Sequence, residues 1–280
     1  MQQTIRINHG IELSNLKSLT IFAGLNVLES PARAFEVCEA LKRWTDERGM
    51  GLVFKASWDK ANRTSLTSFR GPGLRTAQDV FSQLRQSFGV SLVTDIHEPA
   101  QVEKLTPYVD VLQIPAFLSR QTDLLHAACQ SGLPILIKKM QMMSPLDALR
   151  IVDKCVALGC KEVILCERGT TFGYNNLVVD PLAFKTLASA GTPVVFDVTH
   201  ALQQPGGLGQ STDGRGEQTI PLALAGVSQG IAGLFFECHP NPADALCDGP
   251  CAIRLMDVPR LLDRVGAVDR LVKSWTCVGA

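Results

Sequence analysis

The sequence has no excess of charge of either sign. Among its 280 residues, 27 Lys and Arg balance 27 Asp and Glu. Proteins that bind nucleic acid or an anionic membrane usually carry a basic excess or a basic run, and the chain has neither. We therefore expect no nucleic-acid partner and no membrane partner. A positively charged binding site would have to be a local concentration of cations within a neutral protein.

Long apolar runs are also missing. Residues 1–6 lack the apolar core of a signal peptide, and a run such as 232–236 is far too short to span a bilayer. The nine cysteines are an odd number and lack the usual zinc spacing, so we expect reduced thiols that serve mainly as small core residues. These absences predict a cytoplasmic protein.

Apolar runs of strand length alternate with longer helical patterns along the whole chain. Apolar residues recur at helical spacing over 74–88 and 258–272. The strands read as uniformly apolar, which is typical of a parallel sheet covered by helices. They are expected at 19–24, 51–55, 91–94, 109–114, 134–138, 162–166, 193–197 and 233–237.

Eight such units in 280 residues predict an α/β fold, a single (β/α)8 TIM barrel over residues 1–280 with a short N-terminal extension. An open doubly wound sheet is the alternative. It is less favoured because no Gly-x-Gly-x-x-Gly motif opens the first helix.

Polar side chains stand at the predicted carboxyl ends of these strands, where barrel enzymes have their active sites. Each could alone be a solvated loop residue, and Asp95 could simply start the next helix. Together they converge on one mouth, which packing alone does not explain. They are Asn26, Lys55, Asp95, Gln113, Lys138, Arg168, Asp197, His200 and Glu237.

The segment 55–65 is the most informative in the chain, because it places three cations among small hydroxyl and amide side chains. Such a set suits a phosphate or a carboxylate, whereas a solvated turn is the alternative. With Lys138 and Arg168, Lys55 and Lys60 would form a positive pocket without nearby acids on the same strands. Mutual repulsion would make that pocket stable mainly when anions occupy it. Two or three negative groups are implied, as in phosphoenolpyruvate.

Several motifs together resemble the signature of the 3-deoxy-D-manno-octulosonate 8-phosphate synthase family. They are KASWDKANRTS at 55–65 with FRGPG at 69–73, NVLES at 26–30, TDIHEP at 94–99, QIPAFLSRQTD at 113–123, FGYNNLVVD at 172–180, FDVTHAL at 196–202 and CDGP at 247–250. The resemblance covers almost the whole chain. It implies a cytoplasmic, homotetrameric barrel that joins phosphoenolpyruvate to arabinose 5-phosphate, a transferase reaction of lipopolysaccharide synthesis.

The resemblance also implies roles for individual residues. Lys138 and Arg168 would hold the phosphate of phosphoenolpyruvate, with Gln113 and Ala116 lining that site. The carboxylate would be bound by Lys55, Ser57 and Lys60. The phosphate of the neighbouring subunit's sugar would be bound across an interface by Asn62, Arg63 and Thr64. This crossing is expected because Arg63 follows Lys60 too closely for both to face one pocket comfortably.

The chemistry of the reaction fits these residue types. The methylene carbon of the enol attacks an aldehyde, and Lys60 is the natural donor to the oxygen that becomes alkoxide-like. Water must then add to the oxocarbenium-like carbon, and either Asp95 or His200 could direct it. The residues do not decide between these two.

One branch of the family binds a divalent metal through His, Glu, Asp and Cys, which correspond here to His200, Glu237, Asp248 and Asn26. An amide oxygen is a poor replacement for a thiolate toward iron or zinc. The sequence therefore resembles the metal-independent branch, and we expect no metal and no cofactor. Asn26 is then a catalytic candidate, and Glu237 and Asp248 are substrate-binding candidates.

The glycine-rich stretch 205–218 follows the seventh strand and is long enough to act as a lid. Family members usually carry two adjacent arginines there, followed by alanine. Here Arg215 is retained as a substrate-binding candidate, but Gly216 and Glu217 replace the other two. We expect weaker closure over anionic substrates.

Two alternatives are open. A sister enzyme condenses phosphoenolpyruvate with erythrose 4-phosphate on the same barrel, although Asn26 and the run 62–65 favour the pentose phosphate. The second alternative is a barely active paralogue that binds sugar phosphates without converting them. The altered lid is the only feature that supports this alternative.

Overall fold

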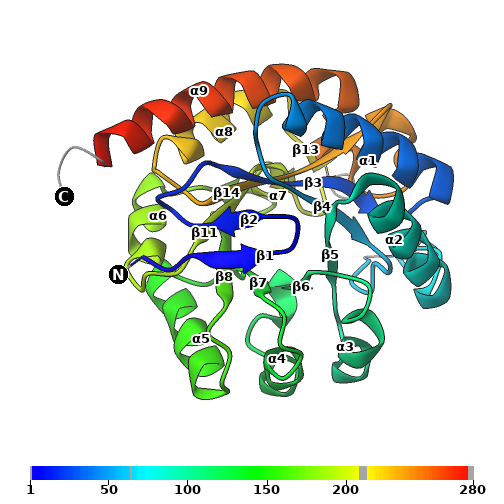
Figure 1. Ribbon diagram of the computed structural model, residues 1–280, viewed down its shortest axis with the longest axis horizontal. Helices are drawn as coiled ribbons and strands as arrows, with labels where there is room; N and C mark the ends of the chain where they lie inside the picture. The colour runs from blue at the N-terminus through cyan, green and yellow to red at the C-terminus, as the bar shows by residue number, and fades with distance from the viewer. Residues whose placement is uncertain (1, 64, 208–212, 277–280) are drawn as a thin grey trace.

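The computed structural model describes residues 2–63, 65–207 and 213–276. Within them, eight parallel strands form a closed barrel surrounded by helices (Figure 1). Successive strands pair in chain order, and β11 and β3 each pair with β14 to close the ring. The barrel strands are β3 (Thr20–Val27), β4 (Leu52–Ser57), β5 (Ser91–Asp95), β6 (Val111–Ile114), β7 (Ile135–Lys138), β8 (Val163–Glu167), β11 (Val194–Asp197) and β14 (Gly233–His239).

The predicted barrel is confirmed, and each predicted strand overlaps an observed one. The boundaries differ by a few residues, as for β3, which extends to Val27 instead of ending at 24. Asn26 therefore lies within a strand and not in the loop after it. Asp95 ends β5 and does not start a helix, because the next helix begins at Pro99 with Glu98 as its N-cap.

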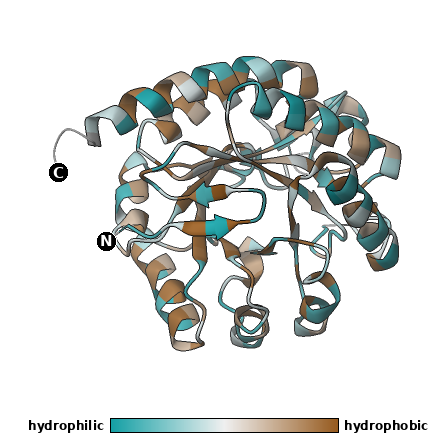
Figure 2. Cartoon of the chain, viewed as in Figure 1, coloured by the Kyte–Doolittle hydropathy of each residue, from teal (hydrophilic) through white to brown (hydrophobic). Residues whose placement is uncertain are grey.

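Helices cover the outside of the barrel, and their polar and apolar residues are mixed along each helix (Figure 2). They are α1 (Pro31–Asp46), α2 (Leu74–Phe88), α3 (Pro99–Leu105), α4 (Thr122–Cys129), α5 (Pro145–Ala157), α6 (Pro181–Ala188), α8 (Thr219–Val227) and α9 (Val258–Thr276), with a short α7 (Val198–Ala201). Ser30 and Ser144 each accept a backbone N–H and precede a proline, the expected start of a helix. Apolar residues between strands and helices form the main core.

The N-terminal extension is a hairpin of β1 (Ile5–Ile7) and β2 (Ile11–Leu13). Its four apolar side chains are buried among residues that point into the barrel, such as Phe22. The hydroxyl of Ser91, at the start of β5, donates to the carbonyl of Asn8 in the turn, at 2.9 Å. The hairpin therefore closes the amino end of the barrel and leaves the carboxyl end for the site.

Short elements decorate the barrel. They are the strands β9 (Thr170–Thr171), β10 (Leu177–Val178), β12 (Gln203–Gln204), β13 (Asp213–Gly214) and β15 (Ile253–Arg254), and the 3-10 helices η1 (Ala116–Leu118), η2 (Gly216–Gln218), η3 (Pro242–Asp244), η4 (Gly249–Cys251) and η5 (Leu255–Asp257). In the described part of the chain, no helix is both long and apolar enough to traverse a bilayer.

Candidate active site

A cavity of about 230 Å³ opens at the carboxyl ends of the barrel strands. Most of the residues predicted from the sequence meet there, although they come from segments far apart in the chain. The predicted residues in its wall are Lys55, Lys60, Asn62, Arg63, Asp95, Gln113, Ala116, Lys138, Arg168, His200 and Asp248. The expectation that these strand ends converge on one mouth is therefore met by their shared cavity.

Two of the four predicted pocket cations are paired with buried carboxylates, so the expectation of an unpartnered cluster is wrong for them. The Lys55 ammonium lies 2.5 Å from Oε1 of Glu237, across the barrel mouth. Lys138 donates to Asp197 in the same way. The acids come from other strands of the closed barrel, where spacing along one strand gives no sign of them.

The ring of Phe235 lies beneath both lysines. The Lys138 ammonium is 3.1 Å from the ring centroid, and that of Lys55 is 5.8 Å away. An aromatic face attracts a nearby cation, more so when the cation is removed from water. Phe235 therefore helps to hold the two ammonium groups at the base of the cavity.

Three cations of the cavity remain without an ion pair among the described residues: Lys60, Arg63 and Arg168. Arg168 donates to Oε1 of Gln203 at 2.5 Å and to the carbonyl of His200 at 3.3 Å. Its Nη1 is buried and has no hydrogen-bond partner. A buried guanidinium N–H without an acceptor is costly, so this arrangement is suited to an anionic ligand.

The charge states of the site follow from its ion pairs. Burial acts to raise the pKa of Glu237, but the surrounding cations, His200 foremost, lower it to about 2. Burial likewise opposes the ionisation of Asp95, yet the hydrogen bond and charge of His97 hold the Asp95 pKa well below its usual range. Burial acts to lower the pKa of Lys60, and the carboxylates, led by Glu237, raise it instead. At neutral pH both carboxylates are ionised and Lys60 is a cation.

Asn26 lies behind the cavity wall, at an irregularity in the pairing of β3 with β4. Its amide nitrogen donates to Oε2 of Glu237 and, at 3.2 Å, to Oδ2 of Asp248. Nε2 of His200 lies 3.6 Å from the same Glu237 oxygen. The four residues that correspond to the metal ligands of the other branch are therefore neighbours, with an amide N–H directed at two of the carboxylates.

Three other predicted residues, Ser57, Arg215 and Glu237, are not in the cavity wall. Ser57 is fully buried in β4, and its hydroxyl has no hydrogen-bond partner. Arg215 donates to the carbonyl of Leu177 at 3.1 Å and does not line the cavity. Thr64 lies outside the described residues, as do residues 208–212 of the predicted lid.

Lys60 and Arg63 line the same cavity of one chain. The argument that they are too close in sequence to share a pocket is therefore wrong. The chain between the end of β4 and the start of α2 is irregular. The directions of the two side chains therefore do not follow the periodicity of a strand or a helix. The contribution of Asn62 and Arg63 to a neighbouring subunit's site then rests on the resemblance alone and stays a prediction.

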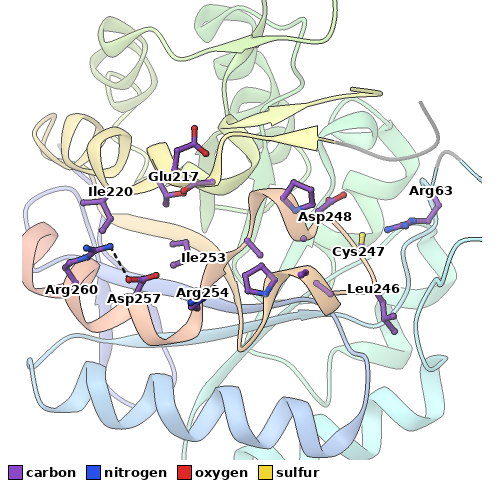
Figure 3. Close-up of a pocket in the computed structure, with 18 residues that line it drawn as sticks. Arg63, Glu217, Ile220, Leu246, Cys247, Asp248, Ile253, Arg254, Asp257 and Arg260 are labelled. Carbon is purple, nitrogen blue, oxygen red and sulfur yellow. Dashed lines mark hydrogen bonds and ion pairs between the residues drawn. The ribbon is translucent and has the colours of Figure 1, made fainter. Parts of the chain in front are cut away.

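Gly216 and Glu217 line a second, larger cavity of about 640 Å³ beside the first. Figure 3 shows Glu217 and Arg63 on opposite sides of this second cavity. Glu217 does not line the cavity that holds Lys138 and Arg168, but it shares the second cavity with Arg63, so its effect on lid closure over the substrates stays a prediction. A Cβ atom at Gly216 would lie 2.8 Å from the carbonyl oxygen of Pro250, so no larger residue fits this backbone unchanged.

Several residues of the site were not among the predicted ones. Nε2 of His97 lies 3.3 Å from Oδ2 of Asp95, and both line the cavity. Gln203 lines it as well, three residues after His200. Their closeness in sequence to a predicted site residue could have identified both. His97 is two residues from Asp95, as Gln203 is three from His200. Phe117 also lines the cavity and is 56% exposed.

Fold and site together define a class of protein: a (β/α)8 barrel whose mouth is a cavity lined by several cations. The sequence model of the DAHP synthetase I family matches residues 3–274, so the chain belongs to that family.

Three relatives are named 2-dehydro-3-deoxyphosphooctonate aldolase, another name for the synthase that the motifs resemble. A protein of Pseudomonas fluorescens is 50% identical over 277 residues, which cover 99% of this chain and 98% of the relative. One of Marinobacter nauticus is 52% identical over 266 residues, 95% of each chain. One of Stutzerimonas stutzeri is 50% identical over 274 residues, 98% of this chain and 97% of the relative. The resemblance seen in the motifs is thereby confirmed.

Proposed function

We propose that the protein condenses phosphoenolpyruvate with D-arabinose 5-phosphate and water, giving 3-deoxy-D-manno-octulosonate 8-phosphate and inorganic phosphate. The observation that carries this proposal is a set of three cations in one cavity that have no ion pair with any residue the structure describes: Lys60, Arg63 and Arg168. The two substrates bring two phosphates and one carboxylate, one anionic group for each cation. The names of the relatives, all at about 50% identity, agree with this reaction.

The substrates are arranged by these cations. Arg168 and Lys138 bind the phosphate of phosphoenolpyruvate, beside Gln113 and Ala116. Lys60 binds the carboxylate, because Lys55 is already engaged with Glu237. These contacts fix the enol at the base of the cavity, so that its methylene carbon faces the opening.

Arg63 and Asn62 bind the phosphate of the sugar at the other side of the same cavity. Holding two anions face to face removes most of the entropy cost of bringing them together, and neutralises their repulsion. Because Lys60 stays protonated, it donates to the aldehyde oxygen as the carbon–carbon bond forms. The water that adds to the resulting cationic carbon is held by Asp95 or His200, whose carboxylate and imidazole both line the cavity.

We further propose that the reaction needs no metal. The amide N–H of Asn26 donates to two of the carboxylates that would serve as ligands, which makes it a substitute for the cation and not a ligand to it. Activity should survive dialysis against a strong chelator. Loss of activity on dialysis and its return with manganese, zinc or cadmium would contradict this proposal.

A cytoplasmic homotetramer remains a proposal as well. The assembly is supported by large apolar side chains that are exposed at the carboxyl end of the barrel, such as Phe117 in the cavity wall and Phe172 directly after β9. Sedimentation of the purified protein measures the assembly directly.

The function is tested by following phosphate release. The protein is mixed with phosphoenolpyruvate and either arabinose 5-phosphate or erythrose 4-phosphate. We expect release only with the pentose phosphate. Release with erythrose 4-phosphate instead would identify the sister reaction, and binding without release would identify an inactive sugar-phosphate binder.

A further inference from the structure

A buried carboxylate fixes the backbone of Arg168. Glu167 ends β8 and is 1% exposed. Its Oε1 accepts the backbone N–H of Arg168 at 3.0 Å and that of Gly169 at 2.6 Å. Gly169 has a φ of +85°, so the chain turns sharply directly after the arginine. One carboxylate oxygen thus holds both amides of the turn that carries Arg168.

A buried ammonium completes this arrangement. Lys139 follows β7 and is 1% exposed, and its Nζ lies 3.6 Å from Oε1 of Glu167. The same Nζ donates to the carbonyls of Met143 at 3.2 Å and Gly169 at 3.3 Å, and to the hydroxyl of Thr170 at 3.0 Å. Lys139 therefore ties the loop after β7 to the turn after β8.

Neither charged group lines the cavity, but the residues next to them in sequence do. Lys138 precedes Lys139, and Arg168 follows Glu167. A buried ion pair costs so much desolvation that apolar residues of similar volume are often at least as stabilising. Stability alone therefore does not explain why a lysine and a glutamate occupy these two positions. The need to place Arg168 does explain it.

We propose that Lys139 and Glu167 are positioning residues that hold the backbone of Arg168, so that its guanidinium meets the anionic group of the substrate. This inference rests on the proposed function, in which that group is the phosphate of phosphoenolpyruvate. The pair acts on one substrate only, since Arg63 and Asn62 stand on a separate segment of the chain.

The test replaces Glu167 by glutamine, and Asp110 offers a matched control. Asp110 is 3% exposed, and its Oδ2 accepts the backbone N–H of Leu92 at 2.8 Å and lies 3.1 Å from a nitrogen of Arg85. It is also a buried carboxylate that joins a backbone amide to a cation, but it precedes β6, at the amino end of the barrel. Both variants, Glu167→Gln and Asp110→Asn, lose one buried charge.

The dissociation constant of phosphoenolpyruvate is measured by calorimetry, alongside the melting temperature. Removing a residue that orients a binding group typically weakens function about 10- to 100-fold. We expect a weakening of that order in Glu167→Gln, with the KM for arabinose 5-phosphate nearly unchanged. Asp110→Asn should lower the melting temperature and leave both substrates unaffected.

Lys139 is tested by a single and a double variant. Lys139→Met leaves the Glu167 carboxylate buried without its cation, which disfavours the ionised form of that carboxylate. The affinity of this variant for phosphoenolpyruvate should fall as the pH is lowered, in a range where the parent's affinity is steady. Adding Glu167→Gln removes the isolated charge, so the double variant should lose that extra pH dependence.

Binding of phosphoenolpyruvate to Glu167→Gln with the parent's affinity would overturn the positioning role. Failure of the parent to bind phosphoenolpyruvate would overturn the proposed function instead. In that case inorganic phosphate, which is expected to meet Arg168 and Lys138 without needing the other contacts of phosphoenolpyruvate, serves as the probe for the same comparison. Equal phosphate affinity in the parent and in Glu167→Gln would then overturn the positioning role.

Discussion

The two ends of the barrel are built from opposite kinds of side chain. At the amino end, the hairpin β1–β2 covers the strands with four buried apolar residues: Ile5, Ile7, Ile11 and Leu13. At the carboxyl end, the same strands finish in buried ion pairs such as Lys55–Glu237 and Lys138–Asp197. One end is closed by burial of apolar surface and the other is left open and charged.

The difference teaches which end is shaped by stability and which by function. Apolar burial stabilises directly, at about 25 cal/mol per Å². Buried ion pairs often contribute little net stability, because the desolvation of both charges offsets their attraction. The lysines and carboxylates of the carboxyl end therefore reflect what the cavity binds and not what the fold requires.

The largest expected effect comes from breaking one of these pairs. Lys55→Met removes the lysine of this pair and leaves the Glu237 carboxylate buried beside His200, which should cost about 3–5 kcal/mol of unfolding free energy. Lys55→Met with Glu237→Gln should recover most of that stability without recovering activity. Urea unfolding and phosphate release measure the two quantities, and a double variant that stays as unstable as the single one would contradict the comparison.

At the amino end, a substitution should lower stability and leave the kinetics unchanged. Leu13 is fully buried against the barrel interior, and Leu13→Ala should cost about 2–5 kcal/mol of stability. Because the hairpin is remote from the cavity, the KM values for both substrates should stay at the parent's values at a temperature where the variant is folded. A raised KM would show that the two ends are coupled.

Acid should destabilise the protein through its carboxyl end. The pKa of Glu237 is lowered from 4.5 to about 2, so its contribution is fully present above pH 4.5 and is lost as the pH falls through about 2. This lowering of the Glu237 pKa corresponds to about 3 kcal/mol of unfolding free energy. Unfolding free energies measured between pH 6 and 2 should fall across this window, and less steeply in the double variant that lacks Lys55 and Glu237.

The smallest effect is expected at Glu217. Because this side chain lines the second cavity, Glu217→Ala should change the KM of either substrate less than twofold, about 0.5 kcal/mol or less as at an ordinary surface site. A marked fall in both KM values would instead show that Glu217 repels bound substrates, as its sequence position first suggested. Steady-state kinetics at low and high salt separate the two outcomes.

The fold and most of the cavity wall could be predicted from the sequence, because both depend on local patterns. Apolar strands repeated between amphipathic helices indicate a parallel barrel, and residues at the strand ends of a barrel must share one mouth. Lys138 and Arg168 were found in this way.

What could not be predicted depends on pairing across the barrel. Lys55 and Glu237 are 182 positions apart in the sequence, and no rule of sequence spacing predicts that they form an ion pair. Lys139 and Glu167 were overlooked because a charged residue beside a predicted site residue reads as part of a solvated loop, while both prove to be buried. The second cavity beside Glu217 was not predicted, because a loop's sequence does not give the direction of its side chains.

The central claim is that the unpaired cations of one cavity divide two phosphorylated substrates between them. Dissociation constants of phosphoenolpyruvate and arabinose 5-phosphate, measured by calorimetry for Arg168→Ala and Arg63→Ala, test it most directly. A lost charge-assisted contact costs about 1.5–3 kcal/mol, or roughly 10- to 150-fold. We expect Arg168→Ala to weaken phosphoenolpyruvate by that factor and Arg63→Ala to weaken the sugar phosphate, each leaving the other substrate unchanged. Equal losses of both substrates in both variants would contradict the account.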